Sequence, residues 1–146
     1  MPTLDDLRTS NPELYTTIKN SQVKKDMDAF QYVTATLDQH EGNWLVKIDQ
    51  NDPKKWELIA IDMDASLPPS AARYTPYINV SPLKQPPIPS TITKDFHAKM
   101  LHMLEQRASL ENALKPLLKP AEIDGVIKRL EQMLEKVKSG EIKLVD

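Results

Sequence analysis

The sequence predicts an α+β fold with N-terminal helices, a small antiparallel sheet of two or three strands, and a C-terminal antiparallel helical hairpin. Helix start signals recur in the first 21 residues, strand-like apolar runs follow Gly42, and apolar residues return at helical spacing after residue 93. The length of 146 residues fits one domain. We therefore expect residues 1–146 to form a single domain that contains a helix-strand part (1–67), a Pro-rich connector (68–92), a helical hairpin (93–140) and a tail or short strand (141–146).

The first 38 residues carry three helix start signals. Thr3 can cap a helix with acids in its first turn, and Asn11 followed by Pro12 forms a second start. A third segment follows Ser21, so residues 12–38 form either one helix with a kink near Asn20 or two helices. We expect Gly42 to end the last of them. The third segment is expected to bury one apolar stripe and to expose a polar face: the stripe is Val23, Met27, Phe30, Val33 or Ala35, and Leu37, and the polar face is Lys24, Lys25, Asp28 and Gln31.

Two apolar runs after Gly42 have the character of strands. Residues 44–48 and 56–61 are rich in Trp, Val, Ile and Leu, and the seven residues between them are polar and include a proline. This pattern predicts an antiparallel hairpin with a long loop. Residues 77–80 are a third, shorter candidate, expected at an edge because Pro76 precedes it.

Prolines separate the strands from the C-terminal helices. Seven of the 12 prolines lie from Pro68 to Pro89, which excludes a helix and predicts an extended connector. Beyond it, we expect one helix from Thr93 to a kink or end at Lys115-Pro116, and another from Pro120 to Ser139-Gly140. Residues 141–145 alternate, as in a last strand or a packed tail. The two helical stripes follow 4-3 spacing: Phe96, Met100, Met103, Arg107, Leu110, Leu114 and Leu117, then Ile123, Ile127, Leu130, Leu134 and Val137.

Composition makes several function classes improbable. The absence of Cys excludes disulfides, thiolate metal sites and a cysteine nucleophile. A net charge of −2 offers no basic field for nucleic acid, and three glycines leave no phosphate-cradling loop. We find no signal peptide and no apolar run near the ~20 residues of a membrane helix. We therefore expect a soluble, cytoplasmic protein without a cofactor, and export by a specialised secretion system stays open.

One local pattern points to an enzyme. The apolar run Leu58–Ile61 ends in Asp62-Met63-Asp64, which looks like the first motif of the haloacid dehalogenase phosphatase family. The resemblance implies that Asp62 attacks phosphorus, that Asp64 protonates the leaving group, and that both help to hold Mg²⁺. The family's Gly-Thr is replaced here by Ala65-Ser66. A Mg²⁺-dependent phosphatase-like enzyme is therefore our alternative rather than our main hypothesis.

Two further patterns are candidate sites. Pro86 and Pro89 form a PxxP pair of the kind that docks on aromatic grooves, and the competing interpretation is a stiff strap between sheet and hairpin. His97 and His102 are five residues apart, which is not the i, i+4 spacing of helical metal ligands. We therefore expect no metal site.

The main hypothesis is a non-enzymatic protein–protein interaction module, such as an adaptor, assembly factor or chaperone-like subunit. The two C-terminal stripes together present more apolar surface than a small sheet can cover, so a protein partner or a second copy should cover the rest. Small acidic α+β chaperones of specialised secretion systems have a comparable size, and a secreted effector that acts on a host protein is a further alternative. Arg107 interrupts its stripe, which indicates either a pair with Glu131 or Asp124 or a partner surface. The expected partner-binding residues are Met100, Met103, Leu104, Arg107, Leu110, Leu130, Met133 and Leu134.

Overall fold

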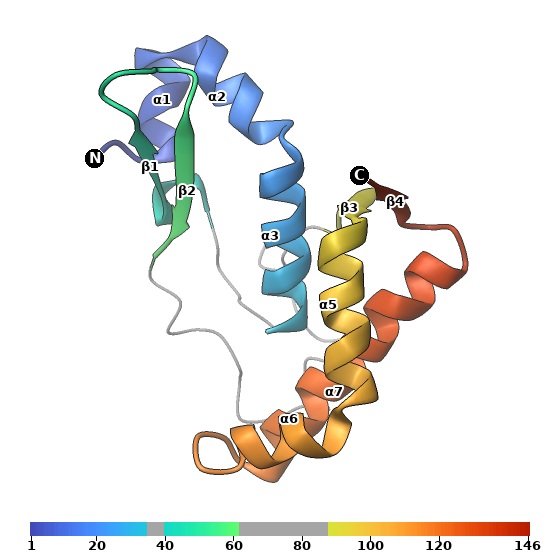
Figure 1. Ribbon diagram of the computed structural model, residues 1–146. Helices are drawn as coiled ribbons and strands as arrows, with labels where there is room; N and C mark the ends of the chain where they lie inside the picture. Colours follow the sequence, from blue (N-terminus) through green and yellow to red (C-terminus); the bar gives the residue numbers. More distant parts are fainter. Residues whose placement is uncertain (35–39, 62–87) are drawn as a thin grey trace.

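The computed structural model describes residues 1–34, 40–61 and 88–146, and it confirms a mixed α+β fold (Figure 1). The N-terminal part contains three helices and a hairpin, and the C-terminal part contains three helices and two short strands. In chain order the elements are α1 (Leu4–Ser10), α2 (Pro12–Lys19), α3 (Gln22–Val33), the 3₁₀ turn η1 (Glu41–Asn43), β1 (Trp44–Ile48), β2 (Trp56–Ala60), β3 (Thr91–Thr93), α5 (Lys94–Glu105), α6 (Arg107–Leu114), α7 (Pro120–Lys138) and β4 (Lys143–Val145).

The expected helix starts are confirmed by their hydrogen bonds. The hydroxyl of Thr3 accepts from the Asp6 amide at 3.0 Å, and the Asn11 side chain accepts from the Leu14 amide at 3.2 Å. Ser21 caps α3 in the same way, so the segment from residue 12 is two helices rather than one kinked helix. The prediction that Gly42 ends this segment is wrong, because α3 ends at Val33 and Gly42 lies in η1.

The described strands form two small sheets. β1 and β2 pair antiparallel, with Trp44 opposite Ala60, which confirms the predicted hairpin. β3 and β4 form a second, parallel pair with Thr91 opposite Lys143. The tail therefore ends in a strand, whereas β3 was missed because the connector was predicted to run to residue 92. The strand candidate 77–80 lies outside the described residues.

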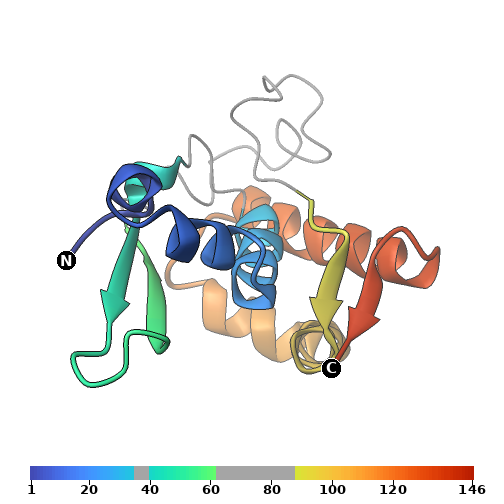
Figure 2. The same ribbon diagram turned by 90° about the horizontal axis from the view of Figure 1, so that it is seen from above.

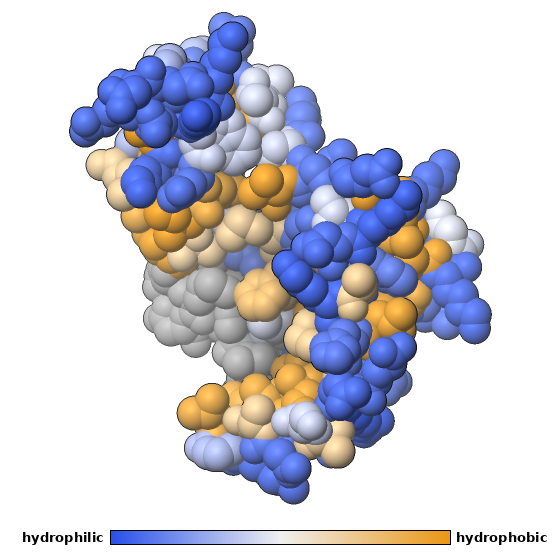
Figure 3. Space-filling view, in the orientation of Figure 1, coloured by the Kyte–Doolittle hydropathy of each residue, from blue (hydrophilic) through white to orange (hydrophobic). Residues whose placement is uncertain are grey.

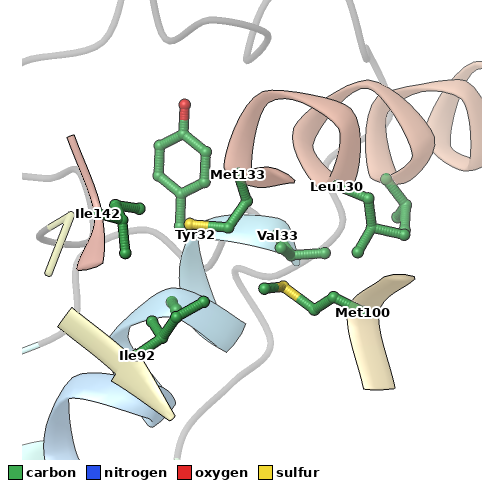
Figure 4. Close-up of a cluster of buried hydrophobic side chains, with 9 residues drawn as sticks. Tyr32, Val33, Ile92, Met100, Leu130, Met133 and Ile142 are labelled. Carbon is green, nitrogen blue, oxygen red and sulfur yellow. The ribbon is translucent and has the colours of Figure 1, made fainter. Parts of the chain in front are cut away.

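The buried side chains form two hydrophobic clusters that share one helix. Seen from above, the hairpin and α1 lie on one side of α3, and α5 and α7 lie on the other (Figure 2). Met27 of α3 packs against the N-terminal cluster, and Ala29, Tyr32 and Val33 belong to the C-terminal one. The single-domain assignment stays a prediction. The N-terminal cluster is Leu4, Leu7, Ile18, Trp44, Val46 and Leu58, and the C-terminal cluster also contains Ile92, Met100, Val126, Leu130, Met133 and Ile142 (Figure 4).

The faces of α3 match the predicted ones only in part: Val33 is buried and Met27 packs against the N-terminal cluster, as expected. Val23 and Phe30, expected in the core, are 52% and 47% exposed. Asp28 and Gln31, expected in water, are buried, and Gln31 is only 2% exposed. The prediction assumed one apolar stripe against one core. Because α3 lies between two clusters, both of its flanks are covered and a different face remains in solvent.

A partly buried ion pair explains the polar flank of α3. The ammonium of Lys24 pairs with the carboxylate of Asp28, one turn along the helix, and lies 4.8 Å from the ring centroid of Trp44. Burial raises the pKa of Asp28, and Lys24 opposes that shift. The pair therefore anchors α3 against the first strand of the hairpin, with the Trp44 ring shielding the cation from water.

The C-terminal helical hairpin is not confirmed as predicted. A single helix was expected from Thr93 to Lys115, but it is broken at Gln106, whose φ of −97° and ψ of 37° end α5. No glycine or proline stands at the break, so packing rather than local sequence causes it. The second helix follows the prediction, since α7 begins at Pro120 and stops before Gly140, which has a φ of 86°. At that left-handed angle glycine avoids a Cβ clash.

Side chains of α3 close the free edge of β3. The Asp26 carboxylate accepts from the amide of Thr93 at 2.9 Å and from its hydroxyl at 2.6 Å. The Gln22 amide donates to the Thr91 carbonyl oxygen at 3.1 Å and accepts from the Thr91 hydroxyl at 2.9 Å. These bonds take the place of a neighbouring strand and fix the beginning of α3 against the beginning of α5.

We expect Asp26→Ala to lower the free energy of unfolding by about 2–3 kcal/mol, because it removes two charge-assisted hydrogen bonds to Thr93. Urea unfolding followed by circular dichroism measures this. The matched control is Asp95→Ala, which removes an exposed acid paired with Lys99 at 2.9 Å and should cost less than ~1 kcal/mol. Equal losses in the two variants would contradict the role assigned to Asp26.

Candidate functional site

The clearest candidate site is an apolar hollow of about 140 Å³ where α3, α5, α6 and α7 meet. We call it the groove. Every lining side chain except Thr34 is apolar, and the Thr34 hydroxyl donates to the Phe30 carbonyl oxygen at 3.2 Å. The groove is lined by Phe30, Val33 and Thr34 of α3, Phe96, Met100 and Met103 of α5, Leu110 and Leu114 of α6, and Val126 and Leu130 of α7.

The floor of the groove is part of the C-terminal cluster, its walls are half-buried, and its rim is exposed at Phe30. Met100 and Leu130 are buried, and in Figure 4 their side chains lie near Val33 of α3. Met103 and Leu110 are half-buried, whereas Phe30 stands at the rim. Figure 3 shows hydrophobic residues gathered on the side of α6 that faces α3. The groove therefore presents apolar surface to solvent above a buried apolar floor.

The break at Gln106 builds one wall. The Leu110 amide donates to the Gln106 carbonyl oxygen at 3.0 Å, which starts α6 in a new direction beneath α3 (Figure 1). The Arg107 side chain hydrogen-bonds Glu111 at 2.7 Å and lies 3.6 Å from Glu131 of α7. The hydrogen bond to Glu111 raises the pKa of Arg107. The contact with Glu131 links α6 to α7, whereas the hydrogen bond to Glu111 lies within α6, and Leu110 remains on the groove side.

The structure places the eight expected partner-binding residues in different surroundings. Met100, Met103, Leu110 and Leu130 line the groove. Met133 is buried in the C-terminal cluster, and Leu134 packs against it. Leu104 is half-buried outside the groove, and Arg107 is exposed beside Glu111 and Glu131. The expected pair with Glu131 is therefore present, and half of the predicted set lies in one site.

Several groove residues were not chosen from the sequence. Phe96 and Leu114 belong to the same 4-3 stripe, so spacing alone could have included them. Val126 flanks the second stripe. Phe30 and Val33 lie more than 60 residues before the first C-terminal helix, on α3, and were predicted only as core residues of that helix. No local pattern connects that helix with α6, because the contact is tertiary.

The other predicted sites contribute little to the described structure. Asp62, Asp64 and Pro86 lie outside the described residues, although β2 ends at Ala60 just before the first two. A PxxP ligand needs both prolines on the surface, and Pro89 is buried. Within residues 1–34, 40–61 and 88–146, no three His, Asp or Glu side chains are grouped to hold a metal ion. No helix in these ranges is long and apolar enough to span a bilayer.

The strongest charged cluster surrounds Glu41 and has a structural role. Its carboxylate accepts from Lys19 at 2.8 Å, from the Tyr15 hydroxyl at 2.7 Å, and from Arg8. Burial alone would raise the pKa of Glu41, but these three donors outweigh it and lower the pKa from 4.5 to about 2. Because the donors come from α1 and α2 and Glu41 begins η1, the cluster ties both helices to the start of the hairpin.

We expect Glu41→Gln to destabilise the protein by about 1–3 kcal/mol at neutral pH. A folded pKa below the ordinary value means that the carboxylate stabilises the fold fully above pH 4.5 and loses this effect as the pH falls toward about 2. The difference between wild type and variant in urea unfolding should therefore shrink on acidification. Glu57→Gln, whose exposed partner Lys47 is 3.6 Å away, is the control and should change little. A difference independent of pH would contradict the pKa of Glu41.

Comparisons with protein-family models, with curated proteins and with solved structures found no match to this chain. A function must therefore be inferred from the chemistry of the groove itself. The groove offers shape and apolar contact, and none of its lining side chains is titratable.

Proposed function

We propose that this protein is a non-enzymatic interaction module that binds another protein through the groove. The observation that carries the proposal is an apolar hollow, open to solvent, with the half-exposed ring of Phe30 at its rim. An exposed aromatic residue beside a preformed apolar pocket is typical of a binding hot spot. The class includes adaptors, assembly factors and chaperone-like subunits.

The lining supports binding rather than catalysis. General acid–base and nucleophilic chemistry need titratable or nucleophilic side chains within hydrogen-bond reach of a substrate. The side chains of the groove instead favour aliphatic or aromatic groups, each worth about 1.5–3 kcal/mol when fully buried. Methionines at positions 100 and 103 can adapt to anchors of different shape.

The size of the groove indicates the kind of contact. A volume of about 140 Å³ accommodates roughly one large apolar side chain, since a cavity of about 150 Å³ holds one benzene molecule. A stable interface covers about 800 Å² on each partner. The groove therefore serves as the anchor point of a larger contact. An amphipathic helix that presents apolar residues at i, i+3 and i+4 matches an anchor site formed by several helices.

A photo-crosslinking amino acid in place of Phe30 tests the proposal. In the cells that make the protein, we expect this position to yield discrete cross-linked products with a partner. The matched control is the same replacement at Val23, which is equally exposed on α3 but does not line the groove. Products should be absent or at least ~5-fold weaker there, because binding energy concentrates in the pocket. Equal products at both positions, or none at position 30, would contradict the proposal.

A further inference from the structure

The most exposed large hydrophobic side chain in the described structure belongs to a leucine three residues after Leu114, the last residue of α6 that lines the groove. Leu117, between α6 and α7, is 77% exposed. Its amide donates to the Leu114 carbonyl oxygen at 2.9 Å, and the Leu118 amide donates to the same oxygen at 2.8 Å. The backbone therefore holds Leu117 one turn beyond Leu114, which lines the groove. We call residues 115–119 the tip.

Two lysines flank this leucine. Lys115 and Lys119 are exposed, and no carboxylate among the described residues forms an ion pair with either ammonium group. The Lys115 ammonium has only a 3.4 Å contact with the Asn112 side chain. The nearest acid in sequence, Glu122, accepts from the Lys119 backbone amide at 3.1 Å. The tip thus combines an exposed leucine with two exposed lysines, neither of which forms an ion pair with a carboxylate of the described residues, although Glu111 and Asp124 line the same hollow as Lys115.

We propose that the partner presents an acidic amphipathic helix, whose apolar residues occupy the groove and Leu117 and whose carboxylates lie beside Lys115 and Lys119. This inference rests on the proposed function and names the chemistry of the partner. Leu110 and Leu114 line the groove from α6, and Leu117 follows in the turn directly beyond the end of that helix, so an apolar ligand seated in the groove has a further apolar contact next to it. Charge complementarity at the tip selects an acidic ligand and its orientation.

A second copy of the chain fits this surface less well. A two-fold dimer brings the same patch of both copies together. Contact through the tip would then place the lysines of one copy near those of the other, and like charges disfavour such a contact.

A lipid bilayer also fits less well. Stable binding to anionic lipids generally uses roughly four to eight basic residues or a covalent lipid. The tip supplies two lysines and one exposed leucine, and a flat membrane would leave the groove empty.

Three synthetic helical peptides of equal length test the proposal. The first carries leucines on one face and glutamates on the other, the second replaces the glutamates with lysines, and the third replaces the leucines of the first with alanines. Each is titrated into the full-length protein and followed by anisotropy and by leucine methyl NMR. We expect the acidic leucine peptide to bind at least ~10-fold more tightly than the other two and to shift Leu110, Leu114 and Leu117.

Charge reversal supplies the matched variants. In the double variant Lys115→Glu and Lys119→Glu, the basic peptide should bind more tightly than the acidic peptide, which is the reverse of the wild-type order of affinities. The control is Lys54→Glu with Lys55→Glu, two exposed lysines in the β1–β2 loop without carboxylate partners among the described residues, and it should keep the wild-type order. Equal binding of acidic and basic peptides, or no effect of reversal at the tip, overturns the proposal.

The outcomes separate this inference from the proposed function. If the basic peptide binds better and shifts the same leucines, the groove is a binding site and the acidic partner is wrong. If no peptide binds and the crosslinker at position 30 gives no product, both proposals fail. Co-sedimentation with phosphatidylserine vesicles that Leu117→Ser abolishes, without binding of the acidic peptide, overturns the proposal in favour of a membrane.

Discussion

The packing of α3 against the C-terminal helices, which forms the groove, depends on the contact between the last turn of α3 and α7. The buried guanidinium of Arg129 donates from Nε to the carbonyl oxygen of Val33 at 2.8 Å, in the last turn of α3. A cation is favourable there because unpaired carbonyls give the end of a helix a partial negative charge. One turn further along α7, Gln132 accepts from the Tyr32 hydroxyl at 2.9 Å. These bonds fix the wall of the groove that carries Phe30 and Val33. Without them, α5, α6 and α7 would present an open apolar face rather than a hollow.

Polar contacts fix α3 at three points, and this explains why an aromatic ring stays exposed on it. Asp26 binds the edge of β3, the Lys24–Asp28 pair lies against Trp44, and Arg129 holds the last turn. Each of the three contacts requires a particular face of α3 to point toward its partner. Rotating α3 to bury Phe30 would therefore break these polar interactions. Each polar group left without its partner costs about 1–3 kcal/mol, so breaking the three contacts together costs more than the ~1.5–3 kcal/mol that burial of a phenyl ring contributes. The exposure of Phe30 is thus a consequence of the rest of the fold, and it places the ring at the groove.

The parts of this structure that were predicted from the sequence are those that local chemistry determines. Thr3, Asn11 and Ser21 cap helices through bonds that span three residues, and the polar loop between two apolar runs predicts the hairpin. Val23, Phe30, Asp28 and Gln31 of α3 were assigned to the wrong faces, because burial on this helix depends on two clusters formed by distant segments. The break at Gln106 and the pairing of β3 with β4 are tertiary in the same sense. The same distinction applies to the groove. Met100, Met103, Leu110 and Leu130 could be identified from the 4-3 spacing, whereas Phe30 and Val33 could be identified only once the position of α3 was known.

The central claim is that α3 and the C-terminal helices enclose a preformed apolar groove that accepts an apolar group from solvent. Methionine methyl NMR during titration with benzene tests it most directly, because apolar hollows bind small apolar molecules. Met100 and Met103 line the groove, and Met27 packs against the other cluster. We expect saturable shifts at Met100 and Met103 and no shift at Met27. Shifts at Met27 alone, or no saturable shift at Met100 and Met103, would contradict the claim.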